Sequence, residues 1–349
     1  MPHSAERRHH IETFLATTTF SGATLAPLAG DASFRRYVRV RKDGNTAMLM
    51  DAPPGKEDVR PFLAVATHLV SAGYSAPTIL AADINAGLLL LEDLGDDSFT
   101  RLLKEGRASE TELYEAAIDV LAEWHGVKAP LFGNAALALP AYDEALLMRE
   151  VRLFADWYLP QALGKDNAIA LGQEYMALWR EILASAPLAT NCFVHRDYHA
   201  DNLMWLPGRD GTRRVGLLDF QDGVYGDAAY DLVSLLEDAR RDVPPVLAAQ
   251  LIERYLSATG TGRERFHTAY AMLGAQRNSK IIGIFSRLAA RDGKHHYLQY
   301  LPRVWKHLAQ DVHHPALATL AAWLDRHIDA SARGVIAIRH DARELALTA

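Results

Sequence analysis

The chain carries the sequence VHRDYHADN at residues 194–202 and LLDF at residues 217–220. Asp197 precedes Asn202 by five residues, and Asp219 follows a short apolar segment. Transfer of a phosphoryl group from ATP requires a carboxylate that orients the attacking hydroxyl and accepts its proton, together with an Asn and an Asp that bind Mg²⁺. The pattern therefore predicts a kinase with Asp197 as its base and Asn202 and Asp219 as its metal ligands.

Each of these residues also has a plainer explanation. Asp197 alone would be a loop residue that caps a turn, and Asp219 would be a strand-end residue that caps the turn at residues 221–223. The spacing, and the apolar segment before Asp219, favour chemistry instead. Mg²⁺ prefers oxygen ligands and commonly takes one or two from the protein, which an amide and a carboxylate can supply.

The residues around this pattern have expected supporting roles. His195 precedes Asp197 by two residues and should brace the loop rather than transfer a proton. Asp231 opens a predicted helix, where it either caps the helix or braces the backbone of the catalytic loop, and bracing is favoured. Asp227 either contacts the substrate or caps the same helix. Asp197 and His199 are also expected to contact the substrate.

The N-terminal part of the chain indicates strands and one helix. Residues 37–41 and 46–50 flank Asp43-Gly44-Asn45, which is a hairpin signal. The predicted helix covers residues 57–72, and two further strands cover residues 78–82 and 88–91.

From Glu92 onward, apolar residues recur at helical spacing. Residues 109–112 have the pattern of a capping box at the start of one helix. Further helices are expected at residues 143–158, 168–184, 228–240, 245–258, 263–287 and 316–327. The predicted fold class is α+β, a bilobal protein-kinase-like fold. Its parts would be a nucleotide-binding lobe at residues 1–91, a hinge at 92–95, and a helical catalytic and substrate-binding lobe at 96–349.

Two segments are expected to bind the nucleotide. In the hinge, backbone N–H and C=O groups would pair with the adenine edge whatever the side chains are. The hinge residues concerned are Glu92, Asp93 and Leu94. The second segment is a small-residue turn before the first hairpin, where backbone N–H groups can approach phosphate. Its candidates are Ser33, Phe34, Arg35 and Arg36.

One expected nucleotide-binding residue is missing. Kinases of this plan carry a lysine on the third strand that pairs with the α- and β-phosphates, and Met50 stands near that place. Either an arginine from Arg35, Arg36 or Arg39 supplies the charge, or the nucleotide is held differently. The gap is also the main argument for an inactive, nucleotide-binding regulator.

Three basic residues recur along the predicted helix at residues 263–287. Arg277 and Lys280 lie three residues apart on one helical face, and Arg287 follows them. On sequence grounds a solvated basic face is the favoured explanation. The alternative is an acceptor pocket for an acidic sugar, in which these residues contact the substrate.

The composition is that of an ordinary globular protein, with 49% hydrophobic and 23% charged residues. A formal net charge of −6 argues against a general nucleic-acid binder. Cys192 is the only cysteine, so a reducing compartment is expected. We find no signal sequence and no run near the roughly 20 apolar residues of a membrane span. We therefore expect a cytoplasmic protein with no nucleic-acid, membrane or obligate protein partner.

The pattern H-x-D-x-x-x-x-N followed by L-D-F resembles the aminoglycoside phosphotransferase/choline kinase family, which is related to the protein kinases. Further blocks are similar to the bacterial kinases that phosphorylate the anomeric hydroxyl of N-acetylmuramate and N-acetylglucosamine in peptidoglycan recycling. These blocks are GDASFRRY at 30–37, MDAPP at 50–54, LLEDLG at 90–95, the motif at 195–203 and KIIGIFSRL at 280–288.

The resemblance implies ATP as co-substrate, Mg²⁺ as cofactor and a small amino sugar as acceptor. The third-strand lysine is missing from that subgroup too, so its absence here need not mean inactivity. An anomeric hydroxyl is more acidic than other sugar hydroxyls, which eases the task of Asp197. N-acetylmuramate carries a lactyl carboxylate that the region of Arg277, Lys280 and Arg287 would receive, and N-acetylglucosamine lacks it. An aminoglycoside, choline or homoserine remains an alternative acceptor.

Overall fold

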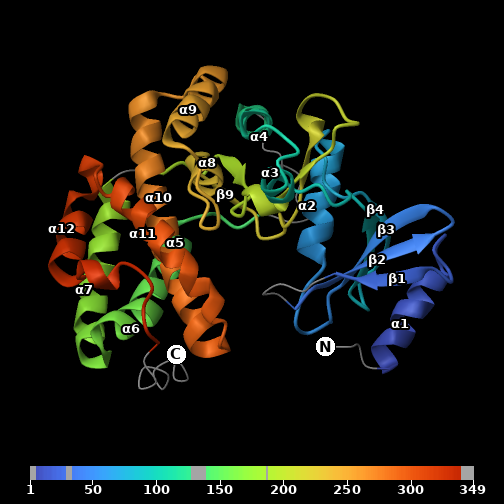
Figure 1. Ribbon diagram of the computed structural model, residues 1–349, viewed down its shortest axis with the longest axis horizontal. Helices are drawn as coiled ribbons and strands as arrows, with labels where there is room; N and C mark the ends of the chain where they lie inside the picture. Colours follow the sequence, from blue (N-terminus) through green and yellow to red (C-terminus); the bar gives the residue numbers. More distant parts are fainter. Residues whose placement is uncertain (1–4, 29–33, 127–138, 186–187, 339–349) are drawn as a thin grey trace. The chain divides into compact units, whose positions relative to one another are not determined.

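The computed structural model describes residues 5–28, 34–126, 139–185 and 188–338 (Figure 1). Contacts between residues divide the chain into two compact units. The first unit holds the described residues up to Val120 together with Ala200–Gly223, and the second holds the other described residues. A division between a nucleotide-binding and a catalytic lobe at residues 92–95 stays a prediction, because these units are defined by contacts alone.

A five-stranded antiparallel sheet forms the centre of the first unit, in the described residues, with strand order β1-β2-β3-β5-β4. The strands are β1 (Thr24–Pro27), β2 (Arg36–Lys42), β3 (Asn45–Asp51), β4 (Ile79–Asp83) and β5 (Leu88–Glu92). Asp43 and Gly44 join β2 to β3 with φ angles of 49° and 81°, as the hairpin signal predicts. The predicted strands are therefore present, with ends shifted by a residue.

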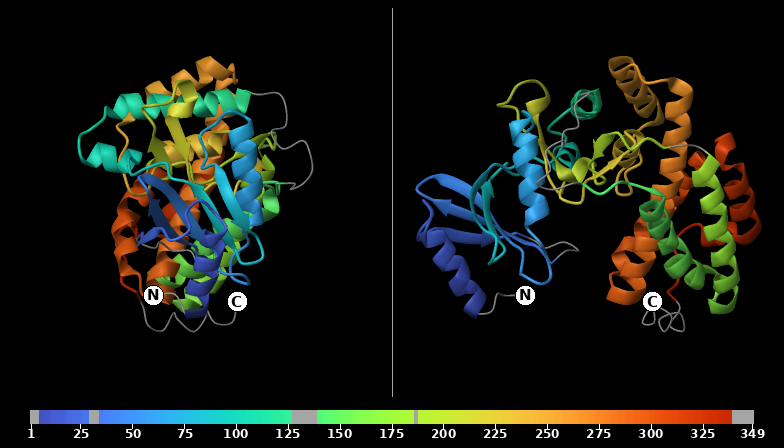
Figure 2. Two further views of the ribbon diagram at one scale, coloured as in Figure 1. Left: turned by 90° about the vertical axis from the view of Figure 1, so that its right-hand side faces the viewer. Right: turned by 180° about the vertical axis from the view of Figure 1, so that it is seen from behind.

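Helix α1 packs on this sheet, as the turned views in Figure 2 show. The helices of the first unit's N-terminal part are α1 (Ala5–Ala16) and α2 (Arg60–Ser71). The sequence does not predict α1, because most of its residues are polar and only Ile11, Phe14 and Leu15 are buried. Arg7 Nε donates to Asp51 Oδ1 at 2.9 Å and ties the start of this helix to the end of β3.

A short hairpin later in the chain places Asn202 and Asp219 in the first unit. It pairs β7 (Leu203–Trp205) with β8 (Val215–Leu217). Leu217 N donates to Ser75 O at 2.7 Å, and Ser75 Oγ donates to Arg213 O at 2.6 Å. These bonds anchor the hairpin to the segment that follows α2. The unit also contains α3 (Phe99–Lys104) and the start of α4 (Glu110–Gly126).

The second unit is mostly helical and is built around α10 (Arg263–Asp292), which is buried along most of its length. Helices α5, α8 and α11 pack against α10 (Figure 2). The other elements are α5 (Glu144–Leu153), a π-helical turn (Phe154–Tyr158), α6 (Leu159–Leu163), α7 (Lys165–Ser185), β6 (Cys192–Val194), β9 (Val224–Gly226), α8 (Ala229–Leu236), α9 (Pro245–Thr259), α11 (Leu301–Asp311) and α12 (Ala318–His327).

The predicted helices are present, with ends shifted by up to five residues. The helix expected at residues 143–158 splits into α5 and the π-helical turn. Helix α11 is missing from the sequence-based prediction. Within the described residues, no helix combines the length and apolar composition needed to cross a membrane.

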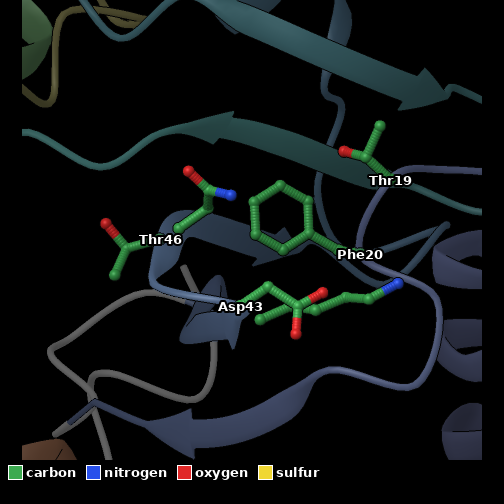
Figure 3. Close-up of a pocket in the computed structure, with 6 residues that line it drawn as sticks. Thr19, Phe20, Asp43 and Thr46 are labelled. Carbon is green, nitrogen blue, oxygen red and sulfur yellow. The ribbon is translucent and has the colours of Figure 1, made fainter.

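Figure 3 shows a pocket of about 300 Å³ at the turn between β2 and β3. Its lining comes from that turn and from the segment after α1, and it consists of Thr19, Phe20, Lys42, Asp43, Asn45 and Thr46. No residue of the predicted site lines it, so this pocket is separate from the candidate chemistry.

The closest backbone approach in the second unit's core is at Gly283 of α10. A Cβ atom there would lie 2.3 Å from Leu153 C and 2.5 Å from Phe154 N. Only a glycine at this position lets the backbone of α10 contact the backbone at the start of the π-helical turn, because both contacting segments are main chain and cannot move aside as a side chain could. Phe154 then stacks on Tyr175 at 4.9 Å between ring centroids and continues the core toward α7.

We predict opposite effects for two glycine-to-alanine substitutions. Gly283→Ala should lower the free energy of unfolding by about 1–3 kcal/mol, because the added methyl group overpacks a backbone contact. Gly172→Ala in α7 is the matched control: its Cβ would lie 3.5 Å from Ala155 Cβ, which is an ordinary contact. The control should stabilise the protein by up to about 1 kcal/mol through helix propensity. Denaturant unfolding of both variants measures this, and a neutral Gly283→Ala would contradict the packing described.

Candidate active site

Asp231 holds the backbone of the segment that carries Asp197. The segment leaves β6, and Asp231 sits in the first turn of α8. Its two carboxylate oxygens accept hydrogen bonds from His195 N at 2.7 Å and Arg196 N at 2.9 Å. Burial raises the pKa of Asp231 to about 7, against the lowering effect of these two bonds. Asp231 thus fixes the two residues that precede Asp197.

Arg196 has a left-handed backbone, with φ of 74°. This conformation is costly for a residue with a side chain and persists only where neighbours impose it. Besides the bond from its N–H to Asp231, its carbonyl accepts from Ser234 Oγ at 3.3 Å. Both contacts come from α8, so this helix determines the path of the chain into Asp197.

Asp197 is partly exposed and ionised. Burial would raise the pKa of this carboxyl, but the nearby Lys280, His199 and Arg277 side chains lower it to about 2. A carboxylate in this state can accept a hydrogen bond from a hydroxyl and later its proton.

Glu150 of α5 is a buried carboxylate that gathers the donors around Asp197, and the sequence does not reveal it. Lys280 Nζ lies 2.9 Å from its Oε1, and Gln276 Nε2 donates to its Oε2 at 2.9 Å. Arg196 Nη2 and the hydroxyl of Tyr142 also donate to it. Burial raises the pKa of Glu150, yet Lys280 and Arg196 lower it to about 2. A lone glutamate in an amphipathic helix carries no local signal of such a role.

Arg277 and Lys280 of α10 do not form a solvated face, so that expectation is wrong for this pair. Arg277 is 5% exposed, and its Nη2 donates to Ser234 Oγ at 2.9 Å. Lys280 also lies 3.3 Å from the hydroxyl of Tyr230. Arg287 follows Lys280 by two helical turns, and burial lowers its pKa. Arg277 and Lys280 lie on the buried middle part of α10, whereas the side chains of Arg265 and Arg291, near its ends, are 51% and 52% exposed.

Two other predicted substrate residues are also buried. Asp227 accepts from Ala229 N at 3.1 Å and Ala189 N at 2.9 Å, and it pairs with Arg265 Nη2 at 2.6 Å. Its carboxylate therefore fixes the backbone before α8, which agrees with the capping alternative. His199 is 7% exposed and is among the residues that lower the pKa of Asp197.

The two predicted metal ligands lie at the same end of the hairpin in the first unit. Asn202 directly precedes β7, Asp219 follows β8 by two residues, and Leu218 N donates to Asn202 O at 3.0 Å. The Asp219 side chain is 47% exposed, and its backbone has φ of 60°. One amide and one accessible carboxylate suit Mg²⁺, which takes its other oxygens from phosphate and water.

Arg35 is the candidate arginine that lies beside Asp219. Its Nη1 is 3.7 Å from Asp219 Oδ1, its Nη2 is 3.7 Å from Asp222 Oδ2, and its Nε is 3.5 Å from Glu57 Oε2. Phe34 is 60% exposed. Ser33 and the turn before it lie outside the described residues. Arg35 thus brings a guanidinium to the place where the predicted metal ligand stands.

The other two arginines are placed differently. Arg36 opens β2 opposite Asp51. Arg39 is buried and pairs with Asp93 Oδ2 at 2.7 Å and Asp96 Oδ1 at 2.8 Å. The positive charge of Arg39 is therefore neutralised by two carboxylates of the segment after β5. Met50, at the place of the missing lysine, is 1% exposed in the sheet.

In the predicted hinge, side chains hold the segment in place. Glu92 accepts from Thr78 Oγ1 at 2.9 Å and pairs with Arg209. A Cβ at Gly216 would lie 3.0 Å from Leu94 Cδ1, so Leu94 packs directly on β8. These contacts leave adenine binding by the hinge backbone as a prediction.

Comparison with known proteins places this arrangement among phosphotransferases. Residues 24–267 match the phosphotransferase enzyme family. The N-acetylmuramate/N-acetylglucosamine kinase of Caulobacter vibrioides is 39% identical, across 95% of this chain and 99% of that protein. The protein of the same name from Pseudomonas aeruginosa is 41% identical, across 86% of this chain and 88% of that protein.

Solved structures show the same fold at low sequence identity. The choline kinase LicA from Streptococcus pneumoniae superposes with a TM-score of 0.59 at 13% identity, covering 90% of this chain and all of that chain. The predicted α+β, kinase-like fold is therefore confirmed.

We predict that Asp231→Ala lowers the free energy of unfolding by about 3 kcal/mol. Two backbone N–H groups lose their acceptor, and each unsatisfied buried group costs about 1–3 kcal/mol. The control is Asp325→Ala, which removes an ion pair to Arg333 from a side chain that is 73% exposed. Its effect should stay within about 0.5 kcal/mol. Equal losses in the two variants, measured by denaturant unfolding, would contradict the bracing role.

Proposed function

The chain belongs to the phosphotransferase enzyme family, and we propose that it transfers the γ-phosphoryl group of ATP to the anomeric (C1) hydroxyl of N-acetylmuramate or N-acetylglucosamine. The observation that carries this proposal is the partly exposed carboxyl of Asp197, which follows a backbone segment held by Asp231. The names of two relatives that align over most of this chain support the choice of acceptor. The proposal places the enzyme in the cytoplasm, where ATP is available, and in cell-wall sugar recycling.

Asp197 would orient the anomeric hydroxyl and take its proton late in the transfer. A carboxylate of low pKa is a weak base, but it suits an acceptor whose hydroxyl is more acidic than those elsewhere on a sugar. His195 and Asp231 would keep the supporting backbone in place. The positive charges of Lys280 and Arg277 would stabilise the negative charge on Asp197 before the acceptor binds.

Asn202 and Asp219 would hold Mg²⁺, which supplies positive charge to the β- and γ-phosphates when bound. Arg35 would take the part of the missing lysine, because its guanidinium already lies beside Asp219. A guanidinium can donate two parallel hydrogen bonds to a phosphate, which an ammonium cannot. Ser33, Phe34 and Arg36 would complete the phosphate segment, and the backbone of Glu92, Asp93 and Leu94 would bind adenine.

Lys280 is the cation best placed to receive an acidic group of the acceptor, with Arg277 and Arg287 on the same helix. Lys280 influences the charge state of Asp197, and its side chain is 14% exposed. A lactyl carboxylate at Lys280 would distinguish N-acetylmuramate from N-acetylglucosamine. Asp227, with its carboxylate occupied by three donors, would support the acceptor region through the backbone.

We predict that Asp197→Asn lowers kcat by about 10²–10⁴-fold on either amino sugar, the usual contribution of a positioned acid or base. The affinity for Mg·ATP should change less than about threefold, because the base acts chiefly in the transition state. Steady-state ADP release gives kcat, and calorimetric titration gives the affinity. Asp210→Asn, in an exposed loop, is the control and should keep normal kcat. Near-normal turnover by Asp197→Asn would assign the base elsewhere.

A second prediction concerns the nucleotide. Arg35→Met should raise KM for ATP by about 10–100-fold, since a charge-assisted hydrogen bond contributes about 1.5–3 kcal/mol. Arg35→Lys should recover part of this loss by restoring the charge. Arg41→Met, an exposed arginine of β2, serves as the control. An unchanged KM for ATP in Arg35→Met, with rates measured at saturating sugar, would remove Arg35 from the nucleotide site.

A further inference from the structure

We propose that Glu150 sets the preference between the two amino sugars by neutralising cations that an acidic acceptor would otherwise use. The inference rests on the proposed function and concerns a residue to which the mechanism assigns no step. Glu150 is 5% exposed and lies in the middle of α5. A carboxylate buried to this extent is tolerated only when it is paired and hydrogen-bonded.

The pairing partners of Glu150 are the same cations that act on Asp197. Lys280 lies 2.9 Å from Glu150 Oε1, and Arg196 donates to the same oxygen. Both cations also lower the pKa of Asp197. Arg277 is a further positive charge that acts on Asp197. Glu150 offsets one positive charge of this group, and without Glu150 the group would carry one more net positive charge beside the base.

The contacts of the Lys280 ammonium group indicate how a carboxylate on the acceptor would bind to it. An ammonium group has three donor positions. Glu150 Oε1 at 2.9 Å and the hydroxyl of Tyr230 at 3.3 Å account for two of them. A carboxylate on the acceptor would bind the third position while Glu150 repels it from the far side of the same cation. A neutral acceptor meets no such repulsion, so Glu150 allows one enzyme to use both sugars.

The alternative is that Glu150 only supports the fold. Its contacts to Tyr142 and Gln276 join α5 to neighbouring segments, so its loss would have structural effects as well. A purely structural role predicts equal losses on both sugars. A charge-balancing role predicts that the ratio of kcat/KM for N-acetylmuramate to kcat/KM for N-acetylglucosamine changes.

The test is Glu150→Gln, which keeps the size and hydrogen-bonding capacity of the side chain and removes its charge. The ratio should rise by about tenfold, because removing one nearby charge at the effective dielectric of such a site has an effect of this order. Lys280→Met should change the ratio in the opposite direction. Tyr142→Phe removes a hydrogen bond to Glu150 without changing any charge, and it should leave the ratio within about twofold.

If Glu150→Gln does not fold, the comparison of Lys280→Met with the double variant Glu150→Gln/Lys280→Met isolates the same charge, and the ratio should again rise. An unchanged or lower ratio in a folded Glu150→Gln, or in that comparison, overturns the inference alone. Absence of turnover of both sugars by the wild-type protein overturns the proposed function and the inference with it.

Discussion

The carboxylate of Asp231 accepts hydrogen bonds from two consecutive backbone amides, and the segment that carries Asp197 depends on them. Those amides belong to His195 and Arg196, and Arg196 has a backbone conformation that a residue with a side chain seldom adopts alone. One side chain at the start of α8 therefore replaces the regular hydrogen bonding that ends with β6. The position of the candidate base is a property of this helix as much as of its own loop.

Charge sharing is the second constraint on the second unit. Asp197, Asp231 and Glu150 are carboxyl groups in or near its interior, and Arg196, Lys280 and Arg277 are the cations that face them. Desolvation penalises each of these charges, and neighbours of opposite sign offset the penalty at Asp197 and Glu150. Burial raises the pKa of Asp231, whereas the neighbouring cations lower the pKa values of Asp197 and Glu150.

Features made by residues close together in the sequence are predictable from it. Features made by residues that are far apart in the sequence and meet only in the fold are not. The spacing of Asp197 and Asn202 predicted the phosphotransferase family, and the turn signal at Asp43 predicted the hairpin; both patterns involve neighbours along the chain. Glu150 acquires its role only when α5 meets α10 and the segment at Arg196, which are far apart in sequence. For Arg277 the sequence alone favours a solvated face over an acceptor pocket, because a charged stripe usually faces water, and this rule fails where the middle of α10 is buried.

Arg196 in the second unit and Asp219 in the first have left-handed backbones, with φ of 74° and 60°. Glycine adopts this conformation without a steric penalty, so replacing either residue by glycine would relieve strain at that position. Laboratory evolution for heat resistance alone would therefore tend to remove the predicted metal ligand Asp219 and the Arg196 side chain that donates to Glu150. Any thermostable variant of this protein should be selected for turnover and for melting temperature together.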